Sequence, residues 1–391
     1  MSRKAPPRRA ESWNGHRAGF RHVACTLARR VTDMRGFGVV ALLALAFPPS
    51  PARAAPPEGT PLFITLPPEA LAADVGAGGA VVVGSHFPIG AFHWMPTSSD
   101  TAIGGTQGVA VSRDGKVIVG RAVDDAGFEN AAIWTGGTSW RRLGSFTPGA
   151  QPCDRLLSGS FGASDDGRVV VGLGWDGCGH AHAFRWEEST GMVDLGTTIP
   201  DRSTRANNVS GDGRVIIGWQ EDVTGFRMGA RWINGTQELF RGPFGMVGEA
   251  FGANRDGSIV VGGNCNPLDP VPSGWTWTPA NGVTCFPVPR PPGLVAPFYQ
   301  VLMEATSEDG RVIVGAYSFG LESESLIWFD GEVFFLKDYL RQNGVPDAFD
   351  GWVNTGFALA ITPDGRTLVG FGAGPTTFQG FMVVLPELDS E

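Results

Sequence analysis

The sequence predicts an all-β fold, a seven-bladed β-propeller of four-stranded blades closed by an N-terminal strand. Three observations lead to it. The chain of 391 residues contains 57 Gly and 29 Pro, which at this density punctuate many short strands rather than a few long helices. One short motif recurs seven times along the chain. A second motif follows each copy, so that each unit of roughly 47 residues holds four strands.

The first motif is an apolar strand, an Asp-Gly turn and a second apolar strand that ends in Gly. Asp-Gly between apolar runs favours a tight hairpin of type I′, which needs positive φ at both central residues. The valine-rich triplet after the turn predicts a strand buried on both faces, and its final Gly predicts an unusual φ or a close backbone approach. The copies span 73–84, 108–120, 161–172, 207–218, 251–262, 305–315 and 359–370, and the first lacks Asp-Gly.

The second motif predicts the third strand of each unit and is followed by a short Gly turn and a fourth strand. A β-solenoid would need shorter and more uniform repeats, and two packed sandwiches would not produce one sustained period. The fifth position is Trp in six units, and we expect these side chains to pack between blades. The residues at this position are Trp94, Trp134, Trp186, Trp232, Trp277, Trp328 and Val383.

The two ends of the repeat array predict how the ring closes. The last unit ends without a fourth strand, whereas residues 62–66 precede the first unit and resemble the fourth strands. We therefore expect 62–66 to complete the last blade, which leaves no free sheet edge.

Residues 1–54 are interpreted as an upstream extension and secretory signal peptide, and residues 55–391 as a single propeller domain. The apolar run 36–47 has the length of a signal-peptide core and is short for a membrane span. Ala52, Arg53 and Ala54 supply the small-x-small pattern before a cleavage site. The protein is expected to be extracellular or periplasmic, without a membrane span.

The charge of the predicted mature chain limits its partners. Ten of the 30 Lys and Arg residues precede residue 55, which leaves 20 basic and 37 acidic side chains, a net charge of −17. Such a body repels nucleic acid and favours cationic ligands, although solubility alone also explains it. We expect no nucleic-acid partner and a monomer.

The four cysteines beyond Cys25 predict two disulfides in an oxidising compartment. In a four-stranded blade, the loop between strands two and three shares a face with the loop that joins successive blades. Cys178 and Cys265 fall in the first kind of loop, and Cys153 and Cys285 fall in or beside the second. The predicted pairs are Cys153–Cys178 and Cys265–Cys285.

The pairing of A-x-x-V-S-x-D-G-x-V-V-V-G with H-A-F-R-W resembles the bacterial extracellular HAF repeat family. His182, Ala183 and Phe184 are the triplet that names the family, and the resemblance covers about residues 60–386. It implies a secreted repeat protein but no particular activity.

The segment 178–182 contains the one local group of metal-ligand residue types. His180 and His182 would lie on the same side of a strand, as two metal ligands can. However, His182 occupies a repeat position that holds Gly90 or Asn130 in other units, so packing beside a disulfide is the preferred interpretation. No metal or other cofactor and no catalytic residue are predicted.

The sequence favours a non-catalytic extracellular binding module for a glycan or a cationic ligand. The Asp-Gly turns keep one length in six units, whereas the loops on the opposite face, the loop face, vary and are the expected site. Aromatic side chains beside carboxylates suit a sugar or a cation. The predicted ligand-binding residues are Trp175, Asp176, Trp219, Gln220, Glu221, Asp222, Asn264 and Tyr317.

Two alternatives to a binding module stay open at this point. In the first, these loops merely tolerate insertion, and the protein is a structural envelope or matrix component. A secreted polysaccharide hydrolase or lyase is the other, because propeller sites gather residues from distant blades that no linear motif reveals. The longest loop, 336–357, includes a predicted short helix (LKDYLRQNG) that could cover part of the channel mouth.

Overall fold

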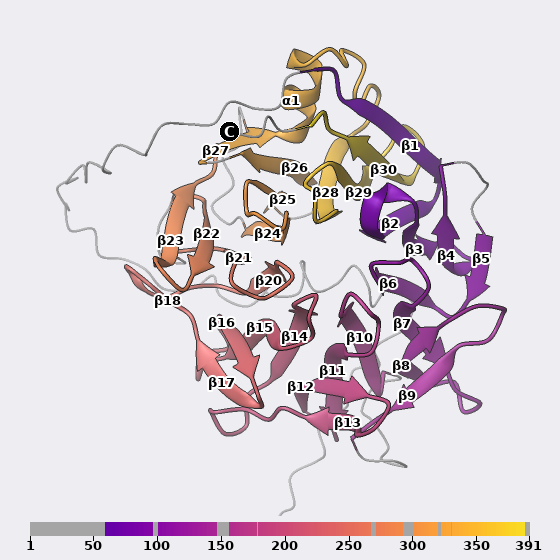
Figure 1. The fold of residues 1–391 in the computed structure, drawn as a ribbon, viewed down its shortest axis with the longest axis vertical. Helices are drawn as coiled ribbons and strands as arrows, with labels where there is room; N and C mark the ends of the chain where they lie inside the picture. The colour runs from indigo at the N-terminus through magenta and orange to yellow at the C-terminus, as the bar shows by residue number, and fades with distance from the viewer. Residues whose placement is uncertain are drawn as a thin grey trace, which may run out of the picture. The chain divides into compact units, whose positions relative to one another are not determined.

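The structure, a computed structural model, describes residues 59–96, 101–146, 156–177, 179–266, 271–291, 300–319, 322–329 and 331–387. In this part of the chain, seven antiparallel sheets of four strands surround a common centre, as Figure 1 shows. The first strands of neighbouring blades contact one another around that centre. The predicted seven-bladed β-propeller of four-stranded blades is confirmed.

The strands of the first four blades, from the inner to the outer position, are as follows. The first blade has β2 (Ala70–Val75), β3 (Val82–His86), β4 (Gly90–Trp94) and β5 (Thr101–Gly104), and the second has β6 (Gln107–Val111), β7 (Ile118–Val123), β8 (Glu129–Trp134) and β9 (Arg141–Gly144). The third has β10 (Ser158–Ala163), β11 (Val170–Asp176), β12 (His180–Glu187) and β13 (Gly191–Asp194), and the fourth has β14 (Thr204–Val209), β15 (Val215–Glu221), β16 (Arg227–Ile233) and β17 (Thr236–Leu239).

The remaining three blades follow the same order. The fifth has β20 (Ala250–Ala253), β21 (Val260–Gly263), β22 (Ser273–Thr278) and β23 (Gly282–Pro287), and the sixth has β24 (Gln300–Thr306), β25 (Val312–Phe319), β26 (Glu322–Phe329) and β27 (Glu332–Phe335). The seventh has β28 (Asn354–Ile361), β29 (Thr367–Ala373), β30 (Phe378–Val384) and, outermost, β1 (Leu62–Pro68). A short hairpin of β18 (Arg241–Gly242) and β19 (Gly245–Met246) joins the fourth and fifth blades.

The N-terminal strand closes the ring as the sequence predicts. β1 pairs antiparallel with β30, and Leu62 lies opposite Val384 in the register. Two segments more than 300 residues apart thereby form one sheet, so the last blade exists only when both ends of the repeat array are folded.

The turn between the first and second strands differs from the predicted type I′. In the second blade, Gly115 has φ 77°, whereas Asp114 does not have positive φ. The Gly115 amide donates to the Ser112 carbonyl at 2.9 Å, as in a type I turn followed by a left-handed Gly. The Ser112 hydroxyl donates to Asp114 and accepts from the Val117 amide, so a side-chain bridge holds the turn and the Asp stays right-handed.

The Gly that ends each valine-rich strand marks a close backbone approach. A Cβ on Gly218 would lie 1.9 Å from the Arg205 carbonyl oxygen, and one on Gly120 would lie 1.8 Å from that of Gln107. The inner strands carry a register shift at this point, for example between Ala206 and Asn208. The glycine therefore admits the bulged inner strand against the second strand.

The repeated Trp side chains pack between blades, as predicted. The His93 ring of the first blade lies 5.5 Å from the Trp134 ring of the second, and Arg231 of the fourth lies 4.1 Å over Trp277 of the fifth. Buried clusters likewise combine residues of adjacent blades, such as Val119 with Phe184. The core is thus a set of layers between blades.

Of the two predicted disulfides, Cys265–Cys285 is confirmed, with Cα atoms 5.7 Å apart. Cys153 and Cys178 lie outside the described residues.

The predicted helix is present as α1 (Leu336–Gln342), but its expected position over the channel mouth is wrong. α1 packs against β26 and β27, the outer strands of the sixth blade, and lies at the rim of the ring in Figure 1. Leu336, Tyr339 and Leu340 are buried, which accounts for its docking at the rim. Among the described residues, no helix is long and apolar enough to cross a membrane.

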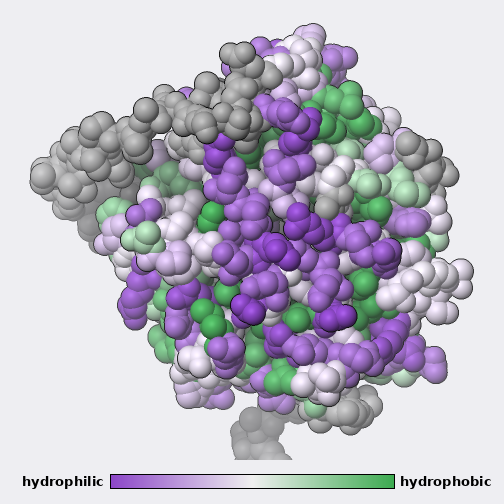
Figure 2. Space-filling view, in the orientation of Figure 1, coloured by the Kyte–Doolittle hydropathy of each residue, from purple (hydrophilic) through white to green (hydrophobic). Residues whose placement is uncertain are grey.

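The end of the channel that carries the Asp-Gly turns, the turn face, is bridged by polar contacts. Asp165 of the third blade pairs with Arg113 of the second at 3.3 Å and with Arg255 of the fifth at 3.0 Å. Backbone hydrogen bonds also join neighbouring turns, as between the Asp165 amide and the Gly211 carbonyl. Figure 2 shows hydrophilic residues gathered over the middle of the ring. A ligand would therefore enter more readily from the opposite, loop face.

Candidate functional site

Charged side chains from several blades gather near the loop face. Arg205 is the second residue of β14, Glu249 directly precedes β20, and Arg227 begins β16. These positions lie at the ends of strands that face away from the turns, whereas Glu304 lies deeper, within β24. We call the group that they form the mouth cluster; it consists of Arg121, Glu129, Phe161, Arg205, Trp219, Arg227, Glu249 and Glu304.

Guanidinium groups and aromatic rings alternate through the mouth cluster. The Arg205 guanidinium lies 4.8 Å from the Phe161 ring centre and 5.4 Å from that of Trp219. Beyond these rings, Arg121 lies 5.3 Å from Phe161 and Arg227 lies 4.4 Å from Trp219. A ladder of three cations and two rings thus crosses the second, third and fourth blades. Cation–π contacts gain strength where the cation is shielded from water, and the Arg205 side chain is only 13% exposed.

Glu249 joins two of these cations. Its carboxylate accepts from Arg205 Nη2 at 3.3 Å and from Arg227 Nη1 at 3.0 Å. The Arg205 Nε donates to Asn207 Oδ1 at 2.6 Å, which fixes the guanidinium plane. At the other end of the ladder, Arg121 Nη1 lies 3.9 Å from Glu129 Oε2. The cations are therefore held in place before any ligand arrives.

Glu304 differs from the other carboxyl groups of the cluster. Burial and, secondly, the negative charge of Glu249 raise the pKa of Glu304 to about 8, against the opposing effect of Arg205. Among the described residues, no group donates a hydrogen bond to this carboxyl. A carboxyl with that pKa is mostly protonated at neutral pH. Three guanidinium charges then face two carboxylates, Glu129 and Glu249, so the mouth cluster carries a net positive charge within an acidic protein.

Burial also acts on the central cation. It lowers the pKa of Arg205 to about 10, while Glu249 opposes the change and Arg227 adds to it. Arg205 still stays charged at neutral pH, but its charge is incompletely compensated. An anionic group at the mouth would supply the missing compensation.

The eight predicted ligand-binding residues lie on the loop-face side, and one of them belongs to the mouth cluster. Trp219 is 2% exposed beneath Arg205 and Arg227, while Tyr317 and Gln220 are also buried. Gln220 accepts from the Thr198 amide at 2.9 Å and holds the segment that leads into β14. Ligand binding by the eight residues stays a prediction.

The remaining five predicted ligand-binding residues stabilise loops or lie at the surface. Asp222 accepts from the amides of Thr224 and Phe226, and Asn264 accepts from the Val301 amide. Trp175 is half-buried, Glu221 is partly exposed and Asp176 is exposed at the end of β11. These side chains shape the rim of the loop face.

The sequence did not single out Arg205, Glu249 or Glu304. A signal was present, because charged residues stand there at positions that are apolar in some other units. Other units place Leu302 and Phe357 at the position of Arg205. No linear pattern indicated that these three residues converge from three different blades.

His182 is paired with a carboxylate from the neighbouring outer strand. His182 Nδ1 lies 2.9 Å from Asp194 Oδ2, and this hydrogen bond raises the pKa of His182. In the part of the chain that the structure describes, no group of three or more His, Cys, Asp or Glu side chains could hold a metal ion; Cys178 lies outside that part.

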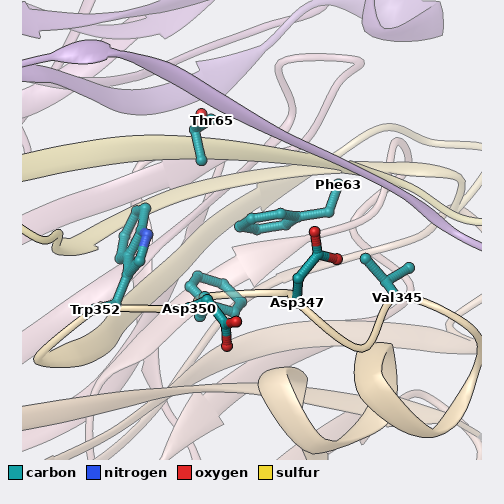
Figure 3. A pocket seen from close by; sticks show the side chains of 7 residues that line it. Phe63, Thr65, Val345, Asp347, Asp350 and Trp352 are labelled. Atoms are coloured by element: carbon teal, nitrogen blue, oxygen red, sulfur yellow. The ribbon is translucent and has the colours of Figure 1, made fainter.

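A second candidate site lies where the ring closes. A cavity of about 260 Å³ separates β1 from the loop that follows α1, and Figure 3 shows its lining. We call it the seam pocket; it is lined by Phe63, Thr65, Val345, Asp347, Phe349, Asp350 and Trp352.

No protein-family model matches the chain, and no curated protein matches it in sequence. Among solved structures, oligogalacturonate lyase from Vibrio parahaemolyticus superposes with a TM-score of 0.54 at 10% identity, over 86% of this chain and 99% of that one. An oligogalacturonate lyase in complex with manganese gives 0.50 at 12% identity, over 85% and 99%.

A lower TM-score, 0.41, relates the chain to TolB from Acinetobacter baumannii at 13% identity, over 68% of this chain. The match spans 64% of that TolB chain, less than two thirds of its length. Identities this low show a shared β-propeller fold and assign neither a family nor an activity.

Proposed function

We propose that the protein is an exported, non-catalytic binding module that holds an acidic glycan at the mouth cluster. The observation that carries this proposal is the ladder of Arg121, Arg205 and Arg227 alternating with Phe161 and Trp219. Planar guanidinium groups suit the carboxylate or sulfate of such a sugar, because they donate two parallel hydrogen bonds. Neighbouring carboxyl groups suit its hydroxyls.

The acidic class of glycan follows from local charge rather than from the charge of the whole chain. The chain from residue 55 has 20 basic and 37 acidic side chains, and its net charge of −17 favours a cationic ligand at a distance. At the mouth, protonated Glu304 leaves the three cations in excess. Interactions with these largely buried cations are screened less than those with the outer surface and outweigh them.

Export and family membership are part of the same proposal. The apolar run 36–47 and the Ala-Arg-Ala pattern at 52–54 support a signal peptide and an extracellular or periplasmic location. The Cys265–Cys285 disulfide is compatible with an oxidising compartment. The repeated motifs support membership of the HAF repeat family.

The proposal can be tested with the chain from residue 55 on a glycan array that includes uronic-acid, sulfated and neutral glycans. We expect acidic glycans to bind and Arg227→Ala to weaken that binding at least tenfold. Arg227 is the most accessible cation of the ladder, with 27% of its side chain exposed. Arg214→Ala is the matched control, because Arg214 is 83% exposed on the turn face. Equal affinities of the two variants, or exclusive binding of neutral glycans, would reject the mouth cluster as the site.

A hydrolase or lyase acting on the same polysaccharide is the second candidate function. Glu249 directly precedes the inner strand β20, Glu304 lies in the neighbouring inner strand β24, and the charge of Glu249 raises the pKa of Glu304. Two carboxyl groups whose pKa values are moved apart in this way can act as the base and the acid of one reaction. If the protein is an enzyme, a bound acidic oligosaccharide should be converted to product. Glu304→Gln should then abolish product formation while binding is retained. Binding without product over prolonged incubation favours the non-catalytic module.

A further inference from the structure

The seam pocket combines aromatic walls with carboxylates. The Phe63 ring lies 4.6 Å from the Phe349 ring, which in turn lies 5.1 Å from the Trp352 ring at an interplanar angle of 89°. Figure 3 shows the Asp347 carboxylate pointing toward the Phe63 ring at the edge of the same space. Phe349 is buried beneath the other two, so the half-buried rings of Phe63 and Trp352 are the ones that can face a guest.

The charges around the pocket favour a cation. Asp350 is paired with Arg341 of α1, with Arg341 Nη2 donating to Asp350 Oδ1 at 2.6 Å. In the part of the chain that the structure describes, no basic side chain pairs with Asp347, which is exposed beside the cavity. The group formed by Asp347, Asp350 and Arg341 therefore carries one net negative charge, opposite in sign to the mouth cluster.

The loop that carries these side chains is held in one shape. Arg341 Nε donates to the Ala348 carbonyl at 3.1 Å, and the Asp350 amide donates to the Asp347 carbonyl at 3.0 Å. Phe349 adopts φ 58°, a conformation that a bulky side chain rarely takes. Such backbone persists only where its surroundings over-determine it, and it concentrates at ligand sites. The packing of Phe349 against Phe63 and Phe381 supplies those surroundings here.

The size of the cavity limits the guest to a head group. Its volume of about 260 Å³ is below the roughly 300–1,000 Å³ of sites that enclose a drug-sized ligand. Its lining combines four aromatic or aliphatic side chains with Thr65, Asp347 and Asp350, so it suits a cation that carries apolar groups better than a strongly hydrated ammonium. A methylated ammonium is weakly hydrated and is the group that aromatic cages recognise.

We propose that the seam pocket binds a methylated ammonium group, with the rings of Phe63 and Trp352 against the methyl groups and Asp347 as the counter-charge. The pocket lies between β1 and the loop after α1. A bound cation would consequently hold the N-terminal strand in the last blade and strengthen the closure of the ring. This site is separate from the mouth cluster and does not depend on the glycan proposal.

The test uses the chain from residue 55 with choline as the probe and its neutral isostere, 3,3-dimethylbutan-1-ol, as the reference. Calorimetry should give choline an affinity at least tenfold above the isostere, and choline should raise the unfolding temperature. Asp347→Asn should weaken choline at least fivefold with an unchanged unfolding temperature in its absence. Asp338→Asn, an exposed acid on α1 outside the pocket, is the matched control and should leave the affinity unchanged.

Two further measurements decide the location and the source of the group. Trp352→Phe keeps a ring and should retain most of the affinity, and Arg227→Ala at the mouth should retain all of it. A peptide with one trimethyl-lysine, compared with the unmodified peptide, distinguishes a protein-borne group from free choline. Equal binding of choline and its isostere, or undiminished binding by Asp347→Asn, would overturn the proposal whatever the glycan array shows.

Discussion

The turn face and the mouth are opposite ends of the same seven inner strands, and they differ in how closely the blades agree. At the turn face, Ser112, Ser164, Ser210, Ser307 and Thr362 each donate to an Asp two residues later. At the mouth, equivalent positions hold Gln107, Arg205 and Leu302. Residues that recur from blade to blade build the ring, whereas those that depart from the pattern make the site.

The two ends also treat charge differently. Asp165 is shared between Arg113 and Arg255 on the turn face, where the chain turns are fixed and the charges are paired. At the mouth, Glu304 has no donor among the described residues and its pKa is raised to about 8. Uncompensated groups destabilise a fold unless a ligand completes them. The mouth is therefore where the protein departs from maximal stability.

The largest effect is expected from removing the closure that both ends require. Deletion of residues 55–67 removes most of β1 and exposes the edge of β30. We expect cooperative unfolding to be lost, because the seventh blade then has a free edge next to the first blade. Calorimetry of the deleted and intact chains from residue 55 measures this. An unchanged melting temperature would show that the ring holds without β1.

Gly218→Ala tests the contribution of a residue that recurs in every unit and lies against Arg205, which does not recur. Its Cβ would lie 1.9 Å from the carbonyl oxygen of Arg205, and backbone cannot move aside as a side chain can. We expect a loss of about 3 kcal/mol or more in the free energy of unfolding, the upper range for overpacking. Urea denaturation measures it. Gly76→Ala is the control, since its nearest contact would be 3.6 Å away, and it should stay within about 0.5 kcal/mol. Similar losses in both variants would contradict the close-approach explanation.

The contrast between the faces also explains what the sequence could predict. Blade number, closure by β1 and Cys265–Cys285 follow from the period of apolar residues and Gly, which local geometry dictates. The type I′ turn was wrong because the Ser112 hydroxyl bridge, rather than the Asp-Gly pair alone, determines the backbone at Asp114. The mouth cluster could not be derived, because Arg121, Arg205 and Glu304 meet only when the ring closes.

The pH dependence of stability should report on Glu304. Its pKa is raised from 4.5 to about 8 in the folded protein, so the folded state keeps a proton that the unfolded state loses above pH 4.5. Stability should therefore fall as pH rises from about 4.5 to 8, by up to about 1.4 kcal/mol per pH unit, and stay level above 8. Glu304→Gln should remove this slope, as measured by urea denaturation at pH 5, 6.5 and 8.

Asp74 provides an internal comparison for this slope. Burial raises its pKa to about 7 although the amides of Val111 and Val75 donate to it, so its contribution falls between about pH 4 and 7. Glu304→Gln should keep the slope that Asp74 contributes between about pH 4 and 7 and lose the slope that Glu304 contributes between about pH 4.5 and 8, so the curve should be shallower below pH 7 and level above it. Identical curves for the parent and Glu304→Gln would show that the mouth leaves Glu304 ionised.

The smallest effect should come from one turn-face hydroxyl. Ser210 Oγ donates to Asp212 at 2.7 Å and accepts from the Val215 amide at 2.9 Å, and the residue is fully buried. Ser210→Ala leaves the Val215 amide without its hydroxyl acceptor, which should cost about 1–2 kcal/mol of unfolding free energy. Ser210→Thr should retain most of it, because Thr362 makes the same pair of contacts in the seventh blade. Glycan binding should be unaffected by either change, since the mouth lies at the other end of β14. If Ser210→Ala weakened binding as strongly as Arg227→Ala, the two faces would be energetically coupled, and the division between a repeated scaffold and a non-repeated site would not hold.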